Sequence, residues 1–333
     1  MAHEVLAELE RIIRTDPARR GLISRETVLG PLLPGHLGRA AHELADHATS
    51  VAIVTGFFIP GATPPAAETD GPLGAVFLAE ALRRLGIETV VLTDALCRSA
   101  VQAAAESLPF PAELILSVPA TEESLGEIWQ PSRYSHLIAL ERVGPNHTSE
   151  SIRLQSGGDP TISKQFENLV KEEDRGRCFN MRGICIDEWT PPLHRLFEQA
   201  QSSASSIVTI GIGDGGNEIG MGSIPWSELA RRLPEPPGGK IACRVACDWT
   251  ILAGVSNWGG YALAAAVAHL RGQVQILEPW TGTQQWEWLQ AVVRNGPAVD
   301  GVTRLHEPTV DGLPFATYIQ PWDAMRQLLG LRR

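Results

Sequence analysis

The sequence predicts an α/β fold with an open, mostly parallel sheet and helices on both faces. Three observations point to this class. From residue 51 onward, short runs rich in β-branched residues alternate with stretches of helical periodicity. The runs are apolar at nearly every position, which is typical of strands that are covered on both faces. With 333 residues, of which 44% are hydrophobic, the chain is long enough for a large core.

The predicted elements follow one another in a regular order. We expect six strands, at 51–56, 89–94, 113–118, 136–141, 206–213 and within 240–254. The apolar spacing predicts helices between them, at 72–86, 95–108, 121–129 and 193–203. Parallel strands connected in this way require right-handed crossovers.

The simplest organisation is one α/β catalytic domain over 51–333, preceded by a helical N-terminal addition over 1–50. Two stretches interrupt the alternation. A Pro/Gly-rich loop at 56–72 follows the first strand, and an insertion extends over about 142–190. Connections of that length in a compact domain are usually functional or contain small elements of their own.

Charge and hydropathy restrict the partners. The formal charge of −10 provides no positive field for a nucleic acid or an anionic membrane surface. The longest apolar run, at 261–270, is far shorter than the roughly 20 residues of a membrane span. Residues 1–21 have the pattern of an amphipathic helix, not of a signal or transit peptide. We therefore expect a cytoplasmic protein with a small-molecule ligand, and a homo-oligomer is compatible with the sequence.

A glycine-rich segment, GIGDGGNEIGMG (211–222), directly follows the fifth predicted strand. Its first glycines match the dinucleotide pattern G-x-G-x-x-G, but Asp214 stands where a pyrophosphate would bind. A plain strand-to-helix turn would explain the glycines and leave Asp214, Asn217 and Glu218 unexplained as a cluster. Because polar groups that converge on a loop often mark a site, we interpret this segment as functional.

The segment ETDGPLGA (68–75) ends the loop after the first strand. Thr69 or Asp70 is a natural cap for the helix that follows, and Gly71 with the next proline suits its first turn. Capping alone would explain these residues, and contact with a ligand is the alternative.

The segment ERVG (141–144) follows the fourth predicted strand. Glu141 is either a carboxylate of the site or an ion-pair partner of Arg142 or Arg133. Arg182, in the insertion, either binds a substrate carboxylate or is a solvated charge.

The segment AGVSNWGGYALAAAVAHL (253–270) predicts a helix with an unusual start. Ser256 or Asn257 is a natural N-cap. Two glycines in the first turn, Gly259 among them, would each cost roughly 1 kcal/mol relative to alanine. That cost favours a function, because the uncovered N–H groups of such a turn suit a carboxylate or phosphate.

Two residues near this segment allow two interpretations each. Trp258 either walls a pocket or belongs to the core. Asp248 is flanked by strand-like residues, and its burial would be costly unless it is paired or binds a cation.

All of these motifs follow predicted strands. The carboxyl ends of parallel strands meet at one edge of the sheet, so weak signals converge on one crevice. No motif demands a cofactor, but several carboxylates in one crevice repel one another without a cation, so Mn²⁺ or Mg²⁺ is compatible with the site. The residues that such a cation would bridge are some of Asp70, Glu141, Asp214 and Asp248.

Together with MRG (181–183) and GGKIACRVACDWT (238–250), these motifs resemble the C-terminal domain of the D-glutamate cyclase family, in order from about residue 50 to 270. The resemblance implies a hydro-lyase that converts D-glutamate to 5-oxo-D-proline without ATP. The chain reads ERVGPNHTSE (141–150) where relatives continue with a basic residue and Asp-Gly-x-Tyr. A related amino dicarboxylate as substrate, or hydration of the lactam in reverse, therefore stays open.

Cyclisation requires a general base, a general acid and a stabilised oxyanion. We expect Asp214 or Glu218 to be the base and its neighbour the acid, because two nearby carboxylates push their pKa values apart. Asn217 and the 215–216 N–H groups would face the oxyanion, and the helix start at 256–260 would hold the α-carboxylate. The residues expected to contact the substrate are Thr69, Asp70, Gly71, Glu141, Arg182, Gly215, Gly216, Ser256, Asn257, Trp258 and Gly259.

Two other functions fit parts of the pattern. A strand followed by a glycine-rich loop with an Asp also occurs in small-molecule kinases, although no Walker lysine follows here. A sensor would bind a small acid in the same crevice without chemistry. Stabilisation by ATP–Mg²⁺ would favour the kinase, and stabilisation by D-glutamate or 5-oxoproline would favour the cyclase.

Overall fold

The computed structural model describes residues 2–17, 22–118, 133–202, 206–233 and 237–332. At its centre lies a six-stranded parallel sheet in the order β5-β4-β1-β6-β7-β8. The α/β class is confirmed, and all six predicted strands are present. They are β1 (Ser50–Thr55), β4 (Glu88–Asp94), β5 (Ile115–Val118), β6 (His136–Leu140), β7 (Val208–Gly213) and β8 (Trp249–Leu252).

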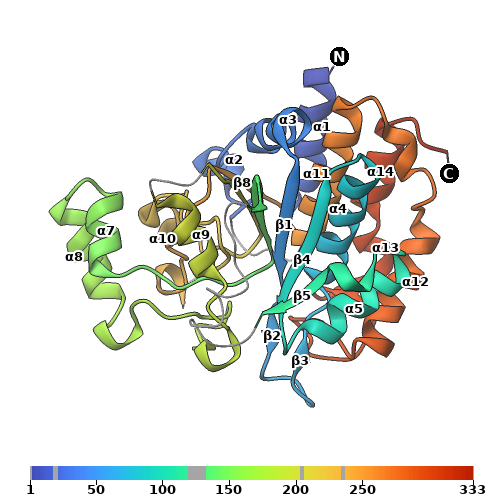
Figure 1. Ribbon diagram of the computed structural model, residues 1–333. Coiled ribbons are helices and arrows are strands. Elements are labelled where there is room, and N and C mark those ends of the chain that lie inside the picture. Colours follow the sequence, from blue (N-terminus) through green and yellow to red (C-terminus); the bar gives the residue numbers. More distant parts are fainter. Residues whose placement is uncertain (1, 18–21, 119–132, 203–205, 234–236, 333) are drawn as a thin grey trace.

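One face of the sheet, here called the helical face, is covered by long helices (Figure 1). The helices α4 and α5 confirm the predictions at 72–86 and 95–108. Helix α11 packs against α4, α3 and α1 at the centre of this face. The helices of this face are α1 (Ala2–Ile13), α3 (His36–His47), α4 (Pro72–Arg84), α5 (Arg98–Ser107), α11 (Ser256–Leu270), α12 (Gly282–Asn295) and α14 (Gln320–Leu328).

The opposite face, here called the loop face, is covered by short helices and irregular chain (Figure 1, green to yellow). The helices lie in the connections from β6 to β7 and from β7 to β8, and the second connection is as irregular as the predicted insertion. Helix α9 confirms the prediction at 193–203, whereas 121–129 lies outside the described residues. The helices are α7 (Ser149–Gln155), α8 (Pro160–Leu169), α9 (His194–Gln201) and α10 (Trp226–Arg232).

The remaining elements are short. Helices α2 (Glu26–Leu29) and α13 (Phe315–Tyr318) have one turn each, and 3-10 helices occupy 112–114, 172–174, 187–189, 238–240 and 274–277. Two antiparallel pairs complete the fold, β2 (Phe58–Ile59) with β3 (Ala66–Ala67) and β9 (Thr309–Val310) with β10 (Leu313–Pro314).

Each face of the sheet has its own core. Along β1, Val51 and Ile53 point into the core of the helical face, and Ala52 and Val54 point into the core of the loop face. The order of the strands reverses between β1 and β6. Ligands of open α/β sheets bind beyond the carboxyl ends of the strands at such a point, so the topology places the site there.

None of the helices in the described residues is both long enough and apolar enough to span a bilayer.

Candidate active site

A cavity of about 570 Å³ opens beyond the carboxyl ends of β1 and β6. Its walls come from Pro17, the loop after β1, Glu141 after β6, the segment 180–189, the turn after β7 and the segment 301–313. These parts of the chain are far apart in the sequence, and only the folded structure brings them together. The polar side chains on the walls include four carboxyl groups and two guanidinium groups, those of Glu68, Glu141, Glu218, Asp311, Arg182 and Arg304.

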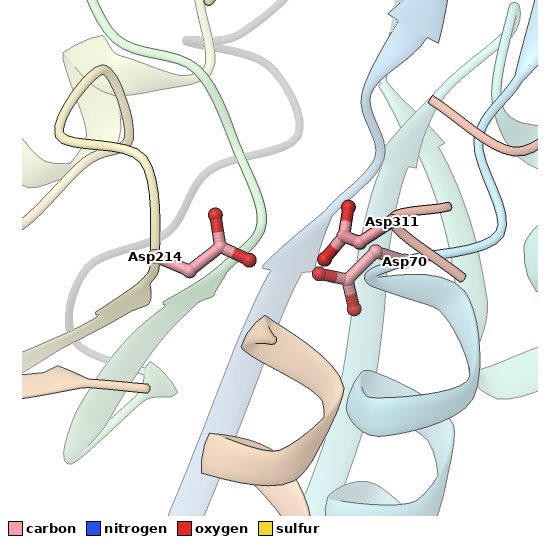
Figure 2. Close-up of side chains that lie close together, drawn as sticks. All are labelled: Asp70, Asp214 and Asp311. Carbon is pink, nitrogen blue, oxygen red and sulfur yellow. The ribbon is translucent and has the colours of Figure 1, made fainter. Parts of the chain in front are cut away.

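Two further carboxyl groups, Asp70 and Asp214, do not line the cavity but lie directly behind its acidic wall. Asp70, Asp214 and Asp311 point toward one another (Figure 2), and one oxygen of each lies within 4.8 Å of the others. Asp214 has the same relation to Glu141 and Glu218. All these side chains are at most 5% exposed, so the site concentrates negative charge where water cannot screen it.

Glu141 follows β6 with its backbone in the left-handed region, at φ 46°. Its Oε2 accepts a hydrogen bond of 2.5 Å from Ser256 Oγ. Burial raises the pKa of Glu141 well above its ordinary value, and the charges of Asp214 and Glu218 raise it further. The raised pKa favours the protonated form of Glu141.

The alternative of an ion pair between Glu141 and Arg142 is wrong. The guanidinium of Arg142 points away and pairs with the buried carboxylate of Asp94 at the end of β4. It also donates to the carbonyl oxygens of Gly56 at 2.8 Å and Pro191 at 2.7 Å. Arg142 thus ties together the loops around Glu141 without neutralising it.

Backbone strain gathers at this cavity. Five non-glycine residues among those described have positive φ, and three of them, Glu141 (46°), Arg304 (63°) and Asp311 (57°), line the cavity. Such conformations are costly, and they persist where the surrounding structure holds them, often at functional sites. The concentration of strained residues supports a functional role for the cavity.

Glu218 closes the glycine-rich turn on itself. Its Oε1 accepts the N–H groups of Asp214 at 3.2 Å and Gly215 at 2.7 Å, and its Oε2 accepts that of Gly216 at 2.8 Å. The expectation that the Gly215 and Gly216 N–H groups face an oxyanion is therefore wrong, because a carboxylate of the same turn occupies them. The Glu218 carboxyl is thus the common acceptor that holds the turn in shape.

Asn217 is buried under the same turn. Its Nδ2 donates to the carbonyl oxygen of Phe179 at 2.8 Å. Its Oδ1 has no hydrogen-bond partner among the described residues. Asn217 does not line the cavity, so it ties the turn to the segment 179–182 and its expected contact with an oxyanion stays a prediction.

The first turns of α4 and α11 cap each other. Asp70 precedes α4, but its carboxylate accepts the N–H groups of Ser256 at 2.9 Å and Asn257 at 2.8 Å, at the start of α11. In return, Asn257 Oδ1 accepts the N–H groups of Gly71 at 3.0 Å and Gly74 at 2.7 Å, at the start of α4. Each helix start is thus capped by a side chain from the other segment.

This arrangement corrects two predictions. We expected the helix start at 256–260 to offer free N–H groups to a substrate carboxylate, but Asp70 and Asp214 occupy them, the latter through Ser256 N at 3.2 Å. We also expected Thr69 or Asp70 to cap α4. Thr69 instead donates through Oγ1 to the carbonyl oxygen of Thr309 at 2.8 Å.

The glycines of α11 have a packing role. A Cβ on Gly259 would lie 2.4 Å from Ile212 of β7, and one on Gly260 would lie 2.7 Å from a side chain of β6. They let the helix approach the sheet closely, which explains their cost in helix propensity. Trp258 is 1% exposed and donates through Nε1 to the carbonyl oxygen of Tyr318 at 2.9 Å. It belongs to the core and not to a pocket wall.

Asp248 does not belong to the site. It is exposed and precedes β8, at the amino end of the sheet. Its Oδ2 accepts the backbone N–H and the hydroxyl of Thr209, each at 2.8 Å. The prediction that it is buried and binds a metal is wrong, because it follows a long connection and enters the sheet from the edge opposite the cavity.

The structure adds three charged cavity residues that the sequence analysis missed, Glu68, Asp311 and Arg304. Asp311 occupies the turn between β9 and β10 together with Gly312. An Asp-Gly pair between apolar residues is a hairpin signal that was readable in the sequence. Nothing in the sequence could have indicated that this hairpin returns to the edge of the sheet.

Comparison with known proteins places the chain in a family. Residues 9–156 and 167–326 match the family model described as "D-glutamate cyclase-like, C-terminal". The chain belongs to this D-glutamate cyclase-like family. It is also 31% identical over 344 aligned residues to the human protein named "D-glutamate cyclase, mitochondrial". The alignment covers 94% of this chain and 50% of the human protein, so the chain spans about half the length of that relative.

In this member of the D-glutamate cyclase-like family, the glycine-rich segment is not a phosphate cradle. A phosphate at the turn would meet the Glu218 carboxylate, which already holds the N–H groups. Gly211 and Gly220 serve a close backbone crossing instead, because a Cβ on Gly211 would lie 2.5 Å from the Cα of Gly220. These contacts tell against the kinase alternative.

Proposed function

We propose that this protein is an ATP-independent D-glutamate cyclase that converts D-glutamate to 5-oxo-D-proline and water. Membership of the D-glutamate cyclase-like family supports the reaction class. The observation that carries the proposal is a pair of carboxyl groups in different environments on one cavity. Burial and neighbouring charge raise the pKa of Glu141, which suits it as the proton donor, and Glu218 accepts three backbone N–H groups that hold its carboxyl in place as the proposed proton acceptor.

The reaction moves two protons from the substrate nitrogen to the departing oxygen. Glu218 accepts the first proton from the α-ammonium, and the amine attacks the γ-carboxyl carbon while Glu141 protonates a carboxyl oxygen. The nitrogen then returns a proton to Glu141 as the lactam forms. Glu218 delivers its proton to the hydroxyl group, the C–O bond breaks and water leaves, which restores both side chains.

The cavity also contributes by confinement. Its volume of about 570 Å³ accommodates one small amino acid. The cavity can hold the substrate folded, with its amine next to its own γ-carboxyl group. The reaction is then intramolecular and already positioned, which removes much of the entropic part of the barrier.

We further propose that a divalent cation, Mg²⁺ or Mn²⁺, binds to Asp70, Asp214 and Asp311. Three carboxylate oxygens within 4.8 Å form a hard-oxygen donor set that fits such ions. When bound, the ion would offset the buried negative charge and polarise the reacting carboxyl group. Asp214 does not line the cavity, so this role suits it better than the direct proton transfer expected from the sequence.

The test is an assay of the purified protein with D-glutamate, read by chiral chromatography, with and without Mn²⁺. We expect 5-oxo-D-proline from the wild type and at least a thousandfold loss of rate in Glu141→Gln. Asp248→Asn, which changes an exposed carboxylate at the opposite edge, is the matched control and should keep full activity. L-Glutamate and 5-oxo-D-proline as alternative substrates report the stereochemistry and the reverse reaction.

Two outcomes would overturn the proposal. Full activity in Glu141→Gln would remove the proton donor from the mechanism. Stabilisation of the fold by D-glutamate without any product, under all metal conditions, would identify a sensor instead of an enzyme.

A further inference from the structure

We propose that Arg182 and Arg304 form a carboxylate-binding subsite at the mouth of the cavity, which holds the carboxylate that substrate and product have in common. The identity of the ligand rests on the proposed function. The existence of the subsite rests on the placement, the charge and the support of these two side chains.

The two arginines come from segments that the fold brings together at the cavity. Arg182 lies in the turn 180–184 on one wall, and Arg304 lies in the segment 301–313 on another. Arg182 Nη2 donates to the carbonyl oxygen of Val302 at 2.8 Å, so one arginine anchors the turn that carries the other. The pair is therefore a feature of the tertiary structure, although the two residues are 122 positions apart in the chain.

Both turns are held by hydrogen bonds from a side chain to backbone N–H groups, exposed in the turn 180–184 and partly buried in the segment 301–313. Asn180 Oδ1 accepts the N–H groups of Arg182 at 2.9 Å and Ile184 at 3.1 Å. Asp300, which is fully buried, accepts through Oδ1 the N–H groups of Val302 and Thr303, each at 2.8 Å. Side chains on turns fixed in this way are preorganised, which lowers the entropic cost of binding a ligand.

The charges at the mouth are unbalanced. Neither Arg182 nor Arg304 forms an ion pair with a carboxylate of the described residues. Burial, and then the neighbouring charge of Arg304, lowers the pKa of Arg182. Arg304 itself has a strained backbone, and the only hydrogen bond of its side chain within the described part of the chain is a long one of 3.4 Å to the carbonyl oxygen of Gly61. Two like charges held side by side favour an anion between them, and guanidinium groups bind carboxylates in a bidentate manner.

The polarity of the cavity orients an amino dicarboxylate. Of the residues that line the cavity, Glu141 and Glu218 are at most 3% exposed, whereas Arg182 is exposed and Arg304 partly exposed, so the two carboxyl groups lie at the inner wall and the two arginines at the mouth. The ammonium and the carboxyl group that reacts must lie at the inner wall, where the proton donor and acceptor are. The α-carboxylate, which does not react and persists in 5-oxoproline, then lies at the mouth. The subsite should therefore bind substrate and product alike.

The experiment compares ligands with and without this carboxylate, by calorimetric titration. The probes are 5-oxo-D-proline and its amide, 5-oxo-D-prolinamide, which differ only in the carboxylate. In Arg304→Gln we expect the affinity for 5-oxo-D-proline to fall roughly 10- to 100-fold, as for a lost hydrogen-bonded ion pair. The affinity for the amide should be unchanged. Arg304→Lys should recover part of the loss, because it keeps the charge but not the fork of donors.

Arg177→Gln is the matched control, because Arg177 lies in the same insertion but pairs with Asp187 and does not line the cavity. It should bind both probes like the wild type. With D-glutamate as substrate, Arg304→Gln should raise KM by the same factor and change kcat less than threefold.

Three results would overturn the proposal: equal weakening of acid and amide, unchanged affinity for the acid, or no binding of 5-oxo-D-proline to the wild type at millimolar concentration. The titration needs no turnover, so the two proposals can fail separately. Carboxylate-dependent binding through Arg304 without cyclisation supports the subsite and removes the proposed function. Cyclisation of D-glutamate, together with an effect of Arg304→Gln on kcat alone, supports the proposed function and removes the subsite.

Discussion

Each of the two walls behind the cavity has a buried carboxyl group that accepts backbone N–H groups, but the N–H groups come from different parts of the chain. On the helical face, the carboxylate of Asp70 accepts backbone N–H groups at the start of α11, 186 residues away in the sequence. On the loop face, the carboxylate of Glu218 accepts three N–H groups of its own turn, two to four residues away. Both place a buried anion on backbone dipoles beside the same cavity.

The difference shows that one wall of the site depends on the assembled domain, whereas the other is held by hydrogen bonds within a single turn. Asp70 joins two long helices, and Asn257 returns the contact, so this wall exists only when the helical face is assembled. The Glu218 turn satisfies its own N–H groups and needs the rest of the fold only to be positioned. Loss of Asp70 should therefore affect the whole domain, and loss of Glu218 should act mainly on the site.

The largest effect is expected for Asp70→Ala. It removes the acceptor of the buried Asn257 N–H. It also removes one of two acceptors of the Ser256 N–H, which keeps Asp214, and one of two acceptors of the Gly71 N–H, which donates to Asp70 Oδ1 at 3.0 Å and keeps Asn257. We expect unfolding free energy to fall by about 3 kcal/mol. Urea denaturation followed by circular dichroism measures this. Unchanged stability would mean that relief of repulsion among the buried carboxylates offsets the lost caps.

A smaller effect is expected for Glu218→Gln. The amide keeps one acceptor oxygen but turns an NH₂ group toward the Gly216 N–H, so the turn loses one buried hydrogen bond and gains a repulsive contact. We expect a loss of about 2 kcal/mol in the unfolding free energy. The rate with D-glutamate should fall far more than stability does. A loss as large as that of Asp70→Ala would contradict the local character of this wall.

A third prediction concerns pH and tests whether Glu141 is neutral in the folded protein. Its folded pKa is raised, so the folded state keeps a proton that the unfolded state releases above its ordinary value of 4.5. The stability that this bound proton contributes is fully present below about pH 4.5. It is lost as the pH rises, by up to about 1.4 kcal/mol per pH unit. Glu141→Gln lacks this slope. Its stability relative to the wild type should therefore rise from pH 5 to 7 in urea titrations, and a constant difference would refute the raised pKa.

The smallest effects are expected for a matched pair of glycines in the helical face. Gly259→Ala places a Cβ 2.4 Å from Ile212, and the strain should outweigh the gain in helix propensity, for a net loss of about 1 kcal/mol. In Gly38→Ala the nearest atom lies at 3.7 Å, so the gain of up to about 1 kcal/mol should persist. Thermal unfolding of both variants checks the opposite signs. The same sign for both would show that close packing does not explain Gly259.

The fold class and the strands were predictable because parallel strands that are covered on both faces are apolar at nearly every position. Such short apolar runs can be recognised from the local sequence alone. The crevice was predictable for the same reason, since the motifs that contain Glu141, Asp214 and Glu218 directly follow strands. Asp248 was misplaced because it precedes a short strand instead of following one. The hydrogen bonds of Asp70 and Asn257 were assigned to the wrong helix because capping rules describe neighbours in sequence, whereas these two residues cap each other across the fold.

The sequence by itself determined the α/β class, the family and the chemical character of the site, because periodicity and motif identity are local properties of the chain. Only the tertiary structure decided which carboxyl groups face the cavity and which lie behind it. It also decided that the pKa of Glu141 is raised by burial while Glu218 accepts the N–H groups of its own turn, and that Asp311, Arg182 and Arg304 complete the site. Burial, distance and the pairing of N–H groups depend on segments far apart in the sequence, and they arise only when the sheet brings those segments together.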